Sequence, residues 1–214
     1  MTPDLVYGRR AVREALRGRR EVLELWATER TVKSEDWLDA ARPKLKADRE
    51  LTDRAETRDH QGVLALMAPY PYADAYELAA AEKPLLAVLD RVTDPRNLGA
   101  VARSAEGAGA TGIVVPAHGS AVVTNLARYL EEVKGGAFRV YGASGEPAAQ
   151  SMWETDLTGG VAIVLGAEGK GLRPLVKRMC DALVSIPLSG AIESLNVSVA
   201  AAVLLYEARR QRGG

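Results

Sequence analysis

Five short apolar runs, separated by stretches with helical periodicity, constrain what the last two thirds of this chain can fold into. Each run is apolar throughout instead of alternating with polar residues, which is typical of strands buried on both faces of a parallel sheet. The apolar runs cover residues 85–89, 112–115, 138–141, 161–165 and 182–186, and the helical stretches cover residues 97–108, 122–133, 172–179 and 195–210. This alternation predicts an α/β domain with a parallel sheet and helices on both of its faces.

The first 67 residues follow a different pattern, in which shorter helical and apolar stretches alternate. This pattern predicts helices over residues 9–16 and 35–46 and strands over residues 22–27 and 62–67. The stretch that follows is rich in proline and tyrosine and lacks periodicity, as interdomain linkers do. We therefore predict a small α/β domain at residues 1–67, a linker at 68–83 and the parallel-sheet domain at 84–214.

The balance of charge limits how this chain can bind a polyanion. Lys and Arg together number 28, equal to the 28 Asp and Glu residues, so any nucleic-acid site must be a local patch. One candidate patch consists of arginines near the N-terminus, which face only Asp4 and Glu14 among the first twenty residues: Arg9, Arg10, Arg13, Arg17, Arg19 and Arg20. The alternative interpretation is a solvated helix face.

Scarce residue types exclude several kinds of site. Cys180 is the single cysteine, so the chain has no internal disulfide, and its amphipathic surroundings predict a small buried residue. His60 and His118 are the two histidines and are too isolated for a zinc site, so we expect no metal. The sequence has no signal peptide and no apolar run of membrane-spanning length, and we expect a cytoplasmic protein without a membrane partner.

Two glycine patterns resemble nucleotide-binding loops but stand in the wrong context. Residues 107–112 read GAGATG, yet they follow a predicted helix and lead into a strand, the reverse of the dinucleotide-binding order. They predict a helix end and a turn. Residues 166–170 lack the glycine spacing of a P-loop, and Gly171 stands where a magnesium-binding Ser or Thr would be. Both a nucleotide-cofactor oxidoreductase and a nucleoside triphosphate hydrolase are therefore disfavoured.

The segment IPLSGAIESLNVSVAAA at residues 186–202 predicts the end of a strand, a glycine-containing loop and the start of a helix. Ser194 holds the expected N-cap position of that helix. Two motifs precede it, LDRVTDPRNLGAVARSA at residues 89–105 and VLGAEGKGL at residues 164–172. In this order, the three resemble the motifs of the SpoU (TrmH-like) RNA ribose 2'-O-methyltransferases of the SPOUT superfamily. VYGRRAVREAL at residues 6–16 and DHQGV at residues 59–63 resemble the small RNA-binding domain of the RlmB-like branch.

The resemblance implies S-adenosylmethionine as cofactor and assigns roles at the motif positions. Loop backbone groups would hold the cofactor at Leu165, Gly166, Ile186, Leu188 and Leu195. The catalytic positions would be Arg103, Asn97, Glu168, Ser194 and Asn196. Because an arginine is hard to deprotonate, we expect Arg103 to orient the RNA and stabilise charge rather than act as a general base. In the purely structural alternative, Arg103 is an exposed flank of its helix, and Ser194 and Asn196 cap the last helix.

The resemblance also implies a fold and an assembly. Family members have a C-terminal trefoil knot, an exception to the rule that chains do not thread loops. Here the last helices would pass through the loop near residues 161–172. Family members are homodimers, and the apolar side chains of Val199, Val203 and Tyr206 on the last helix suit such an interface.

The N-terminal domain bears on the substrate. Its presence favours a guanosine of 23S ribosomal RNA over tRNA, with Arg9, Arg10 and Arg13 as the expected RNA contacts. Methylation of a tRNA ribose is one alternative. A second is an inactive RNA-binding protein that retains the cofactor, because the connection between Pro116 and Thr124 is shorter than in the family. The missing segment borders the substrate side in relatives, so its loss is expected to spare the cofactor motifs.

Overall fold

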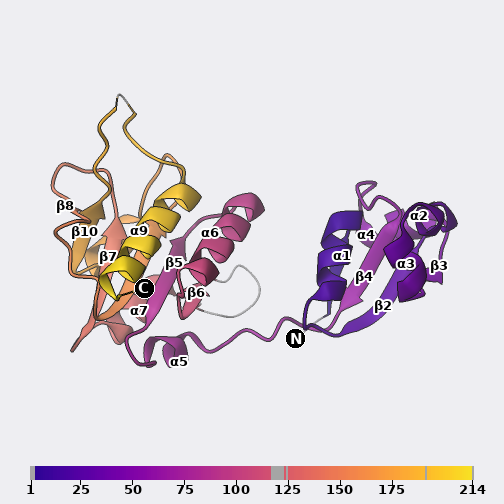
Figure 1. Ribbon diagram of the computed structural model, residues 1–214, viewed down its shortest axis with the longest axis horizontal. Coiled ribbons are helices and arrows are strands. Elements are labelled where there is room, and N and C mark those ends of the chain that lie inside the picture. The colour runs from indigo at the N-terminus through magenta and orange to yellow at the C-terminus, as the bar shows by residue number, and fades with distance from the viewer. Residues whose placement is uncertain (1–2, 117–122, 124, 191, 214) are drawn as a thin grey trace. The chain divides into compact units, whose positions relative to one another are not determined.

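The computed structural model describes residues 3–116, 123, 125–190 and 192–213 of the chain. The chain divides into two compact units, Met1–Pro71 and Tyr72–Gly214, whose helices and strands are labelled in Figure 1. Among the described residues, no helix is both long enough and apolar enough to cross a lipid bilayer.

The first unit is built on a mixed sheet with the strand order β1-β4-β2-β3. β4 pairs antiparallel with β1 and β2, whereas β3 pairs parallel with β2. Val12 and Leu38 are buried against one face of this sheet and Leu51 against the other, so helices cover both faces. The strands are β1 (Asp4–Tyr7), β2 (Val22–Ala27), β3 (Lys44–Leu45) and β4 (Val63–Met67), and the helices are α1 (Arg9–Arg17), α2 (Glu29–Ser34), α3 (Asp36–Ala41) and α4 (Asp48–Ala55).

The single helix predicted over residues 35–46 is wrong in its C-terminal half. α3 ends at Ala41, because Pro43 has no backbone N–H with which to continue a helix. Arg42 takes a left-handed conformation with φ 51°, and the chain then extends the sheet as β3. Helices α2 and α4, with six and eight residues, are too short to stand out by periodicity and are absent from the prediction.

The second unit contains the predicted parallel sheet, in the strand order β6-β5-β9-β7-β10-β8. Every pair of neighbouring strands in it is parallel. All five predicted apolar runs form strands, and all six residues of β5 are buried. The sequence prediction lacks only β8, a two-residue strand at the sheet edge. The strands are β5 (Leu85–Asp90), β6 (Gly112–Val114), β7 (Phe138–Ala143), β8 (Gln150–Ser151), β9 (Gly160–Gly166) and β10 (Ala182–Ser185).

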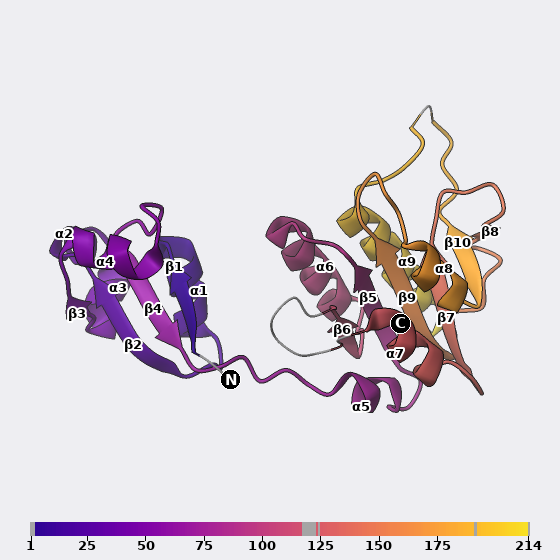
Figure 2. The ribbon, with the colours of Figure 1, turned by 180° about the vertical axis from the view of Figure 1, so that it is seen from behind.

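Helices cover both faces of this sheet, as the continuous apolar strands require. One face carries α6 (Pro95–Gly107) and α9 (Val197–Gln211), seen in front of the strands in Figure 1. The opposite face carries α5 (Ala75–Ala79), α7 (Leu126–Val133) and α8 (Pro174–Met179), and α7 and α8 come forward in Figure 2. The result is a three-layer α/β/α unit.

Polar side chains decide where two of these helices begin. The helix expected over residues 122–133 begins at Leu126, because the Asn125 side chain accepts a hydrogen bond from the backbone N–H of Arg128. The helix expected from residue 195 begins at Val197, with Asn196 as its N-cap. The glycine pattern at residues 107–112 forms the predicted helix end and turn, in which Gly109 has φ 72°. The short connection between Pro116 and Thr124 lies outside the described residues, apart from Pro116 and Val123, which form an isolated parallel bridge.

Glu207 and Gln211 tie the end of α9 to the connection between β8 and β9. The buried carboxylate of Glu207 accepts hydrogen bonds from the Arg210 guanidinium at 2.8 and 2.9 Å and from the Gln211 amide at 2.8 Å. Gln211 in turn accepts from the backbone N–H of Leu157 and donates to the carbonyl of Thr155. The hydrogen bond from Arg210 lowers the pKa of Glu207 from 4.5 to about 2.

We predict that this carboxylate makes the protein sensitive to acid. Because the folded-state pKa lies below the ordinary value, the stabilisation is complete above about pH 4.5 and is lost as the pH falls toward 2. Glu207→Gln removes the titrating group, so the variant should lose less unfolding free energy than the wild-type protein as the pH falls through that range. The measurement is urea unfolding of both proteins across the pH series, and equal slopes would contradict the assignment.

Candidate active site

A pocket of about 750 Å³ lies at the carboxyl ends of β9, β7 and β10, which are neighbours in the sheet. Ligands of open α/β sheets bind outside the carboxyl ends of parallel strands, and this pocket has the size of a small-molecule site. Its lining comes from the three loops that follow these strands and from the start of α9. The position of the pocket makes it the candidate ligand site of the second unit.

The residues expected to hold a cofactor all lie around this pocket. The lining includes Leu165, Gly166, Ile186, Leu188 and Leu195. Two of the expected catalytic residues, Glu168 and Ser194, also line it. The other three, Asn97, Arg103 and Asn196, lie outside the lining, and Asn97 and Asn196 reach it through hydrogen bonds.

The loop after β9 is a tight turn that requires glycine. A Cβ atom on Gly166 would lie 2.2 Å from the carbonyl carbon of Gly171 and 2.5 Å from the backbone nitrogen of Leu172. The turn is closed by a hydrogen bond of 2.8 Å from the N–H of Gly171 to the carbonyl of Ala167. Gly169 and Gly171 have φ values of 72° and 61°, which favour glycine. These glycines bring backbone groups of the loop to the pocket wall.

A buried ion pair fixes the far end of the same loop. Asp90, at the end of β5, is fully buried. One carboxylate oxygen accepts from the backbone N–H of Arg173 at 2.7 Å, and the other accepts from the Arg173 Nε–H at 2.6 Å. The sequence motifs predict no role for either residue. Both Asp90 oxygens are thus used to hold the segment that joins the glycine turn to α8.

A hydrogen-bond network joins residues from three separate motifs. The Asn196 amide nitrogen donates to Asn97 Oδ1 at 3.1 Å and to Glu168 Oε1 at 2.8 Å. The side-chain Oδ1 of Asn196 accepts from the backbone N–H and the hydroxyl of Ser198. Within the described residues, the Asn97 amide nitrogen and Glu168 Oε2 make no hydrogen bond, so one donor and one acceptor remain for a ligand.

Ser194 and Arg103 take different positions from these three residues. The expectation that Ser194 is the N-cap is wrong, because Asn196 caps α9, and Ser194 lies exposed at the pocket. Arg103 lies on the exposed face of α6, opposite the buried Val101 and Ala105. In the described parts of the chain, its guanidinium has no hydrogen-bond or ion-pair partner.

The loop after β7 is a part of the pocket that sequence reasoning missed. It contributes Ser144, Gly145, Glu146 and Pro147 to the lining, next to Ala143 at the end of β7. Glu146 forms an ion pair with Lys177 of α8, with a hydrogen bond of 2.7 Å from Nζ to Oε1. The available signal was the run of small residues directly after an apolar strand. In the sheet, β7 lies between β9 and β10, and the order of the strands in the sequence does not predict this arrangement.

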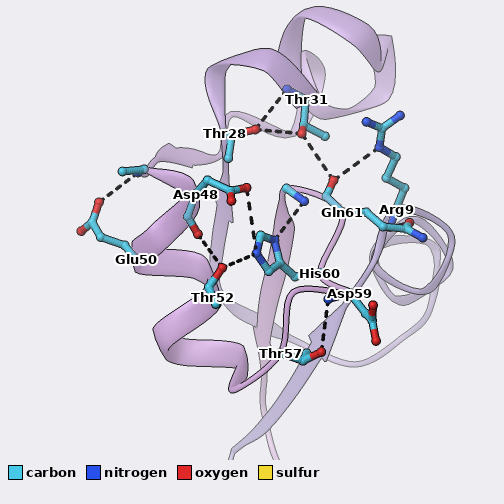
Figure 3. Close-up of polar contacts among 12 residues, drawn as sticks. Arg9, Thr28, Thr31, Asp48, Glu50, Thr52, Thr57, Asp59, His60 and Gln61 are labelled. Atoms are coloured by element: carbon cyan, nitrogen blue, oxygen red, sulfur yellow. Dashed lines mark hydrogen bonds and ion pairs between the residues drawn. The ribbon is translucent and has the colours of Figure 1, made fainter.

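The arginines expected to contact RNA lie on α1 of the first unit. Figure 3 shows Arg9 held by its own domain, where its Nε–H donates to the backbone carbonyl of Gln61 at 3.4 Å. Its backbone N–H also donates to Gln61 Oε1 at 3.0 Å. Its guanidinium also pairs with Glu35 at 3.0 Å. By contrast, Arg10 and Arg13 are exposed and have no ion-pair partner among the described residues. Arg10 and Arg13 are therefore the members of the trio that are available to a ligand.

The loop that holds Arg9 is itself fixed by a buried histidine. Figure 3 shows His60 accepting a hydrogen bond from the backbone N–H of Gly62 at Nδ1, while Nε2 contacts the Thr52 hydroxyl at 2.9 Å. Since Nδ1 is an acceptor, the neutral ring carries its proton on Nε2. His60 therefore has a structural role. No cluster of metal-ligating side chains exists among the described residues.

We predict that Gly166→Ala disrupts the turn after β9. The added methyl group has to displace backbone atoms of Gly171 and Leu172, which should lower the unfolding free energy by about 1–3 kcal/mol. Gly190→Ala is the matched control, because a Cβ there meets no atom within 4 Å. Thermal denaturation of the two variants checks the prediction, which equal melting temperatures would contradict.

We further predict that Asp90→Asn loosens the segment between the glycine turn and α8. An amide cannot accept both hydrogen bonds from Arg173, and losing bonds to a charged group should reduce the unfolding free energy by about 1.5–3 kcal/mol. Asp94→Asn is the control, because an asparagine still caps α6 and the ion pair that it loses, to Arg96, is long at 3.4 Å. Denaturant unfolding should show a larger loss of unfolding free energy for Asp90→Asn than for Asp94→Asn. A smaller effect at position 90 than at position 94 would rule out the proposed constraint.

Comparison with known proteins agrees with this geometry. Residues 120–206 match the profile described as the SpoU rRNA Methylase family, and residues 5–73 match RNA 2'-O ribose methyltransferase substrate binding. A putative TrmH family tRNA/rRNA methyltransferase of Bacillus subtilis is 37% identical, covering 98% of this chain and 96% of its own. A 23S rRNA (guanosine-2'-O-)-methyltransferase, RlmB, of Pseudomonas putida is 38% identical, covering 97% and 96%.

Solved structures give the same relationship. The SpoU methyltransferase AviRb of Streptomyces viridochromogenes, crystallised with the cofactor AdoMet, has a TM-score of 0.72 at 26% identity and covers 98% of this chain and 90% of its own. The alignments to the two sequence relatives span 240 and 241 positions, more than the 214 residues here, so each relative has residues without a counterpart in this chain. With matches to both domain profiles and to near full-length relatives, the chain belongs to the SpoU family of methyltransferases.

Proposed function

We propose that this chain is an S-adenosylmethionine-dependent RNA ribose 2'-O-methyltransferase that acts on a guanosine of 23S ribosomal RNA. The observation that carries the proposal is the pocket at the ends of β9, β7 and β10, beside the network of Asn97, Glu168 and Asn196. The choice of substrate is supported by the RlmB relative and by the substrate-binding profile over residues 5–73. In the bacteria that supply these relatives, ribosomal RNA is cytoplasmic, and we propose the same location for this protein.

The pocket residues suit the proposed cofactor. The pocket offers apolar surface from Leu165, Leu188 and Leu195 for a flat adenine ring and backbone groups around Gly166 for its polar edge. The volume of about 750 Å³ lies within the range of small-molecule sites. When bound, S-adenosylmethionine would supply the methyl group, carried on a positively charged sulfur.

The catalytic residues would act by positioning. A ribose hydroxyl is a weak acid, so the reacting oxygen has to be held in line with the methyl donor. Asn196 fixes Asn97 and Glu168 in one arrangement, which leaves an amide donor and a carboxylate oxygen for the ribose. Arg103, with its exposed guanidinium, would bind the adjoining phosphate and stabilise the negative charge that develops on the oxygen.

Assembly and threading are part of the same proposal. We propose a homodimer, supported by the exposed apolar side chains of Val199 and Tyr206 on α9 and of Leu98 on α6. We also propose that α9 follows a knotted path through the loop at residues 161–172, supported by the family relationship and by the likeness to AviRb. The shortened connection between Pro116 and Thr124 would then alter the substrate side, and the excess length of both alignments supports such a loss.

The experiment is methyl transfer from labelled S-adenosylmethionine to a 23S ribosomal RNA transcript. We predict that Arg103→Ala lowers kcat by about 100-fold or more, as loss of a charge-stabilising donor does, while cofactor affinity measured by calorimetry stays unchanged. Arg103→Lys keeps the positive charge but loses the planar guanidinium, and its activity should lie between those of the wild-type protein and Arg103→Ala. If both variants lose cofactor affinity, Arg103 has a structural role.

A further inference from the structure

A strained arginine stands at the edge of the candidate active site. Arg91 follows directly after the buried Asp90 and has φ 61°, in the left-handed region that favours glycine. Its side chain is exposed and has no hydrogen-bond or ion-pair partner in the described parts of the chain. The left-handed conformation therefore costs folding free energy, and no hydrogen bond or ion pair of the Arg91 side chain to a described residue offsets that cost. Such a residue at a ligand site points to a function for its side chain.

Two more arginines lie on the helix that this loop enters. Arg96 and Arg103 are seven residues apart on α6, so they lie on the same side of the helix, about 10 Å apart along its axis. Gly99 and Ala100 lie between them and are exposed, and a Cβ on Gly99 would meet no atom within 4 Å. Arg96, Gly99, Ala100 and Arg103 therefore form a stripe along α6 with a positive charge at each end and only small residues between the charges. An extended polyanion can approach such a surface closely.

The acidic groups around this stripe do not neutralise it. Asp90 is buried and already paired with Arg173. Asp94 caps α6 and contacts Arg96 through a long ion pair of 3.4 Å, and the Arg96 side chain remains 93% exposed. Glu168 accepts a hydrogen bond from Asn196 on the pocket side. Glu106 lies three residues beyond Arg103 on α6, is exposed, and forms no ion pair with it among the described residues. In the described part of the chain, the exposed carboxylates near the two arginines of α6 are thus Asp94, in a long ion pair, and the unpaired Glu106.

We propose that Arg91 and Arg96 bind the ribose-phosphate backbone of the RNA beside the reacting nucleotide and form one phosphate-binding surface with Arg103. The inference rests on the proposed function, because it needs RNA as the substrate. It adds a sequence-independent contact made by the methyltransferase unit itself. Phosphate contacts of this kind fix the register of an RNA without reading its bases.

The test uses Arg91→Gly in the full-length protein. This substitution removes a positive charge, which should lower RNA affinity, and relieves backbone strain, which should maintain or raise the melting temperature. Binding to a 23S ribosomal RNA transcript, measured by filter binding over a salt series, should weaken roughly fivefold, the effect of one exposed charge contact. The slope of log affinity against log salt should fall by about 0.7, as expected for one phosphate contact on a single strand. The melting temperature should stay equal or rise, because glycine adopts this conformation without strain.

Lys83→Gly is the matched control. Lys83 also carries one positive charge and a left-handed backbone, with φ 47°, but it precedes β5, at the opposite end of the strand from Arg91. Its variant should leave RNA affinity and salt slope unchanged. Arg96→Gln should repeat the affinity loss of Arg91→Gly without raising the melting temperature, since Arg96 has helical geometry.

Two results would overturn the inference. RNA affinity and salt slope could remain at wild-type values in both Arg91→Gly and Arg96→Gln, or Lys83→Gly could lower them as much. In either case, methyl transfer by the wild-type protein to the same transcript would still stand as support for the proposed function. A wild-type protein that neither binds nor methylates the transcript would instead overturn both proposals.

Discussion

The fully buried carboxylate of Asp90 is the constraint on which the candidate site depends. An uncompensated charge at the end of a buried strand would be very costly, so both oxygens need partners. Arg173 supplies them from its backbone and its guanidinium, across 83 residues of chain. Such a pair adds little net stability compared with apolar packing, since desolvation opposes the attraction. Its main effect is geometric, because it allows only one position for the segment between the glycine turn and α8.

That fixed segment explains how distant motifs can share one network. The parallel strands place their carboxyl ends at one edge of the sheet, so loops far apart in sequence meet there. Asn97 follows β5, Glu168 follows β9 and Asn196 follows β10. The amide of Asn196 can hold the other two only if the turn that carries Glu168 stays in place. Gly166 and Asp90 hold that turn from its two ends, one by close backbone contact and one by charge.

The strands of the second unit could be predicted because burial on both faces leaves a continuous apolar run in the sequence. The predictions from sequence fail where a single side chain or a contact distant in the chain determines the local structure. Pro43 ends α3 early, and Asn196 rather than Ser194 caps α9 because its side chain reaches the N–H of Ser198. The pairing of Arg9 with Glu35 and the place of the loop after β7 depend on tertiary neighbours. No local pattern encodes such neighbours, so sequence order alone could not supply them.

A chain without net charge has to create its affinity for RNA locally, and the structure limits where it can do so. Along α1 and the turn after it, Arg9, Arg17 and Arg20 form ion pairs with acidic residues of their own unit. Their charge is then partly neutralised before any ligand arrives. Fewer cations remain there than the sequence suggests, while the exposed side of α6 keeps Arg103 without an acidic partner among the described residues. The division of RNA contact between both units that we propose rests on this pairing of charges, which composition does not reveal.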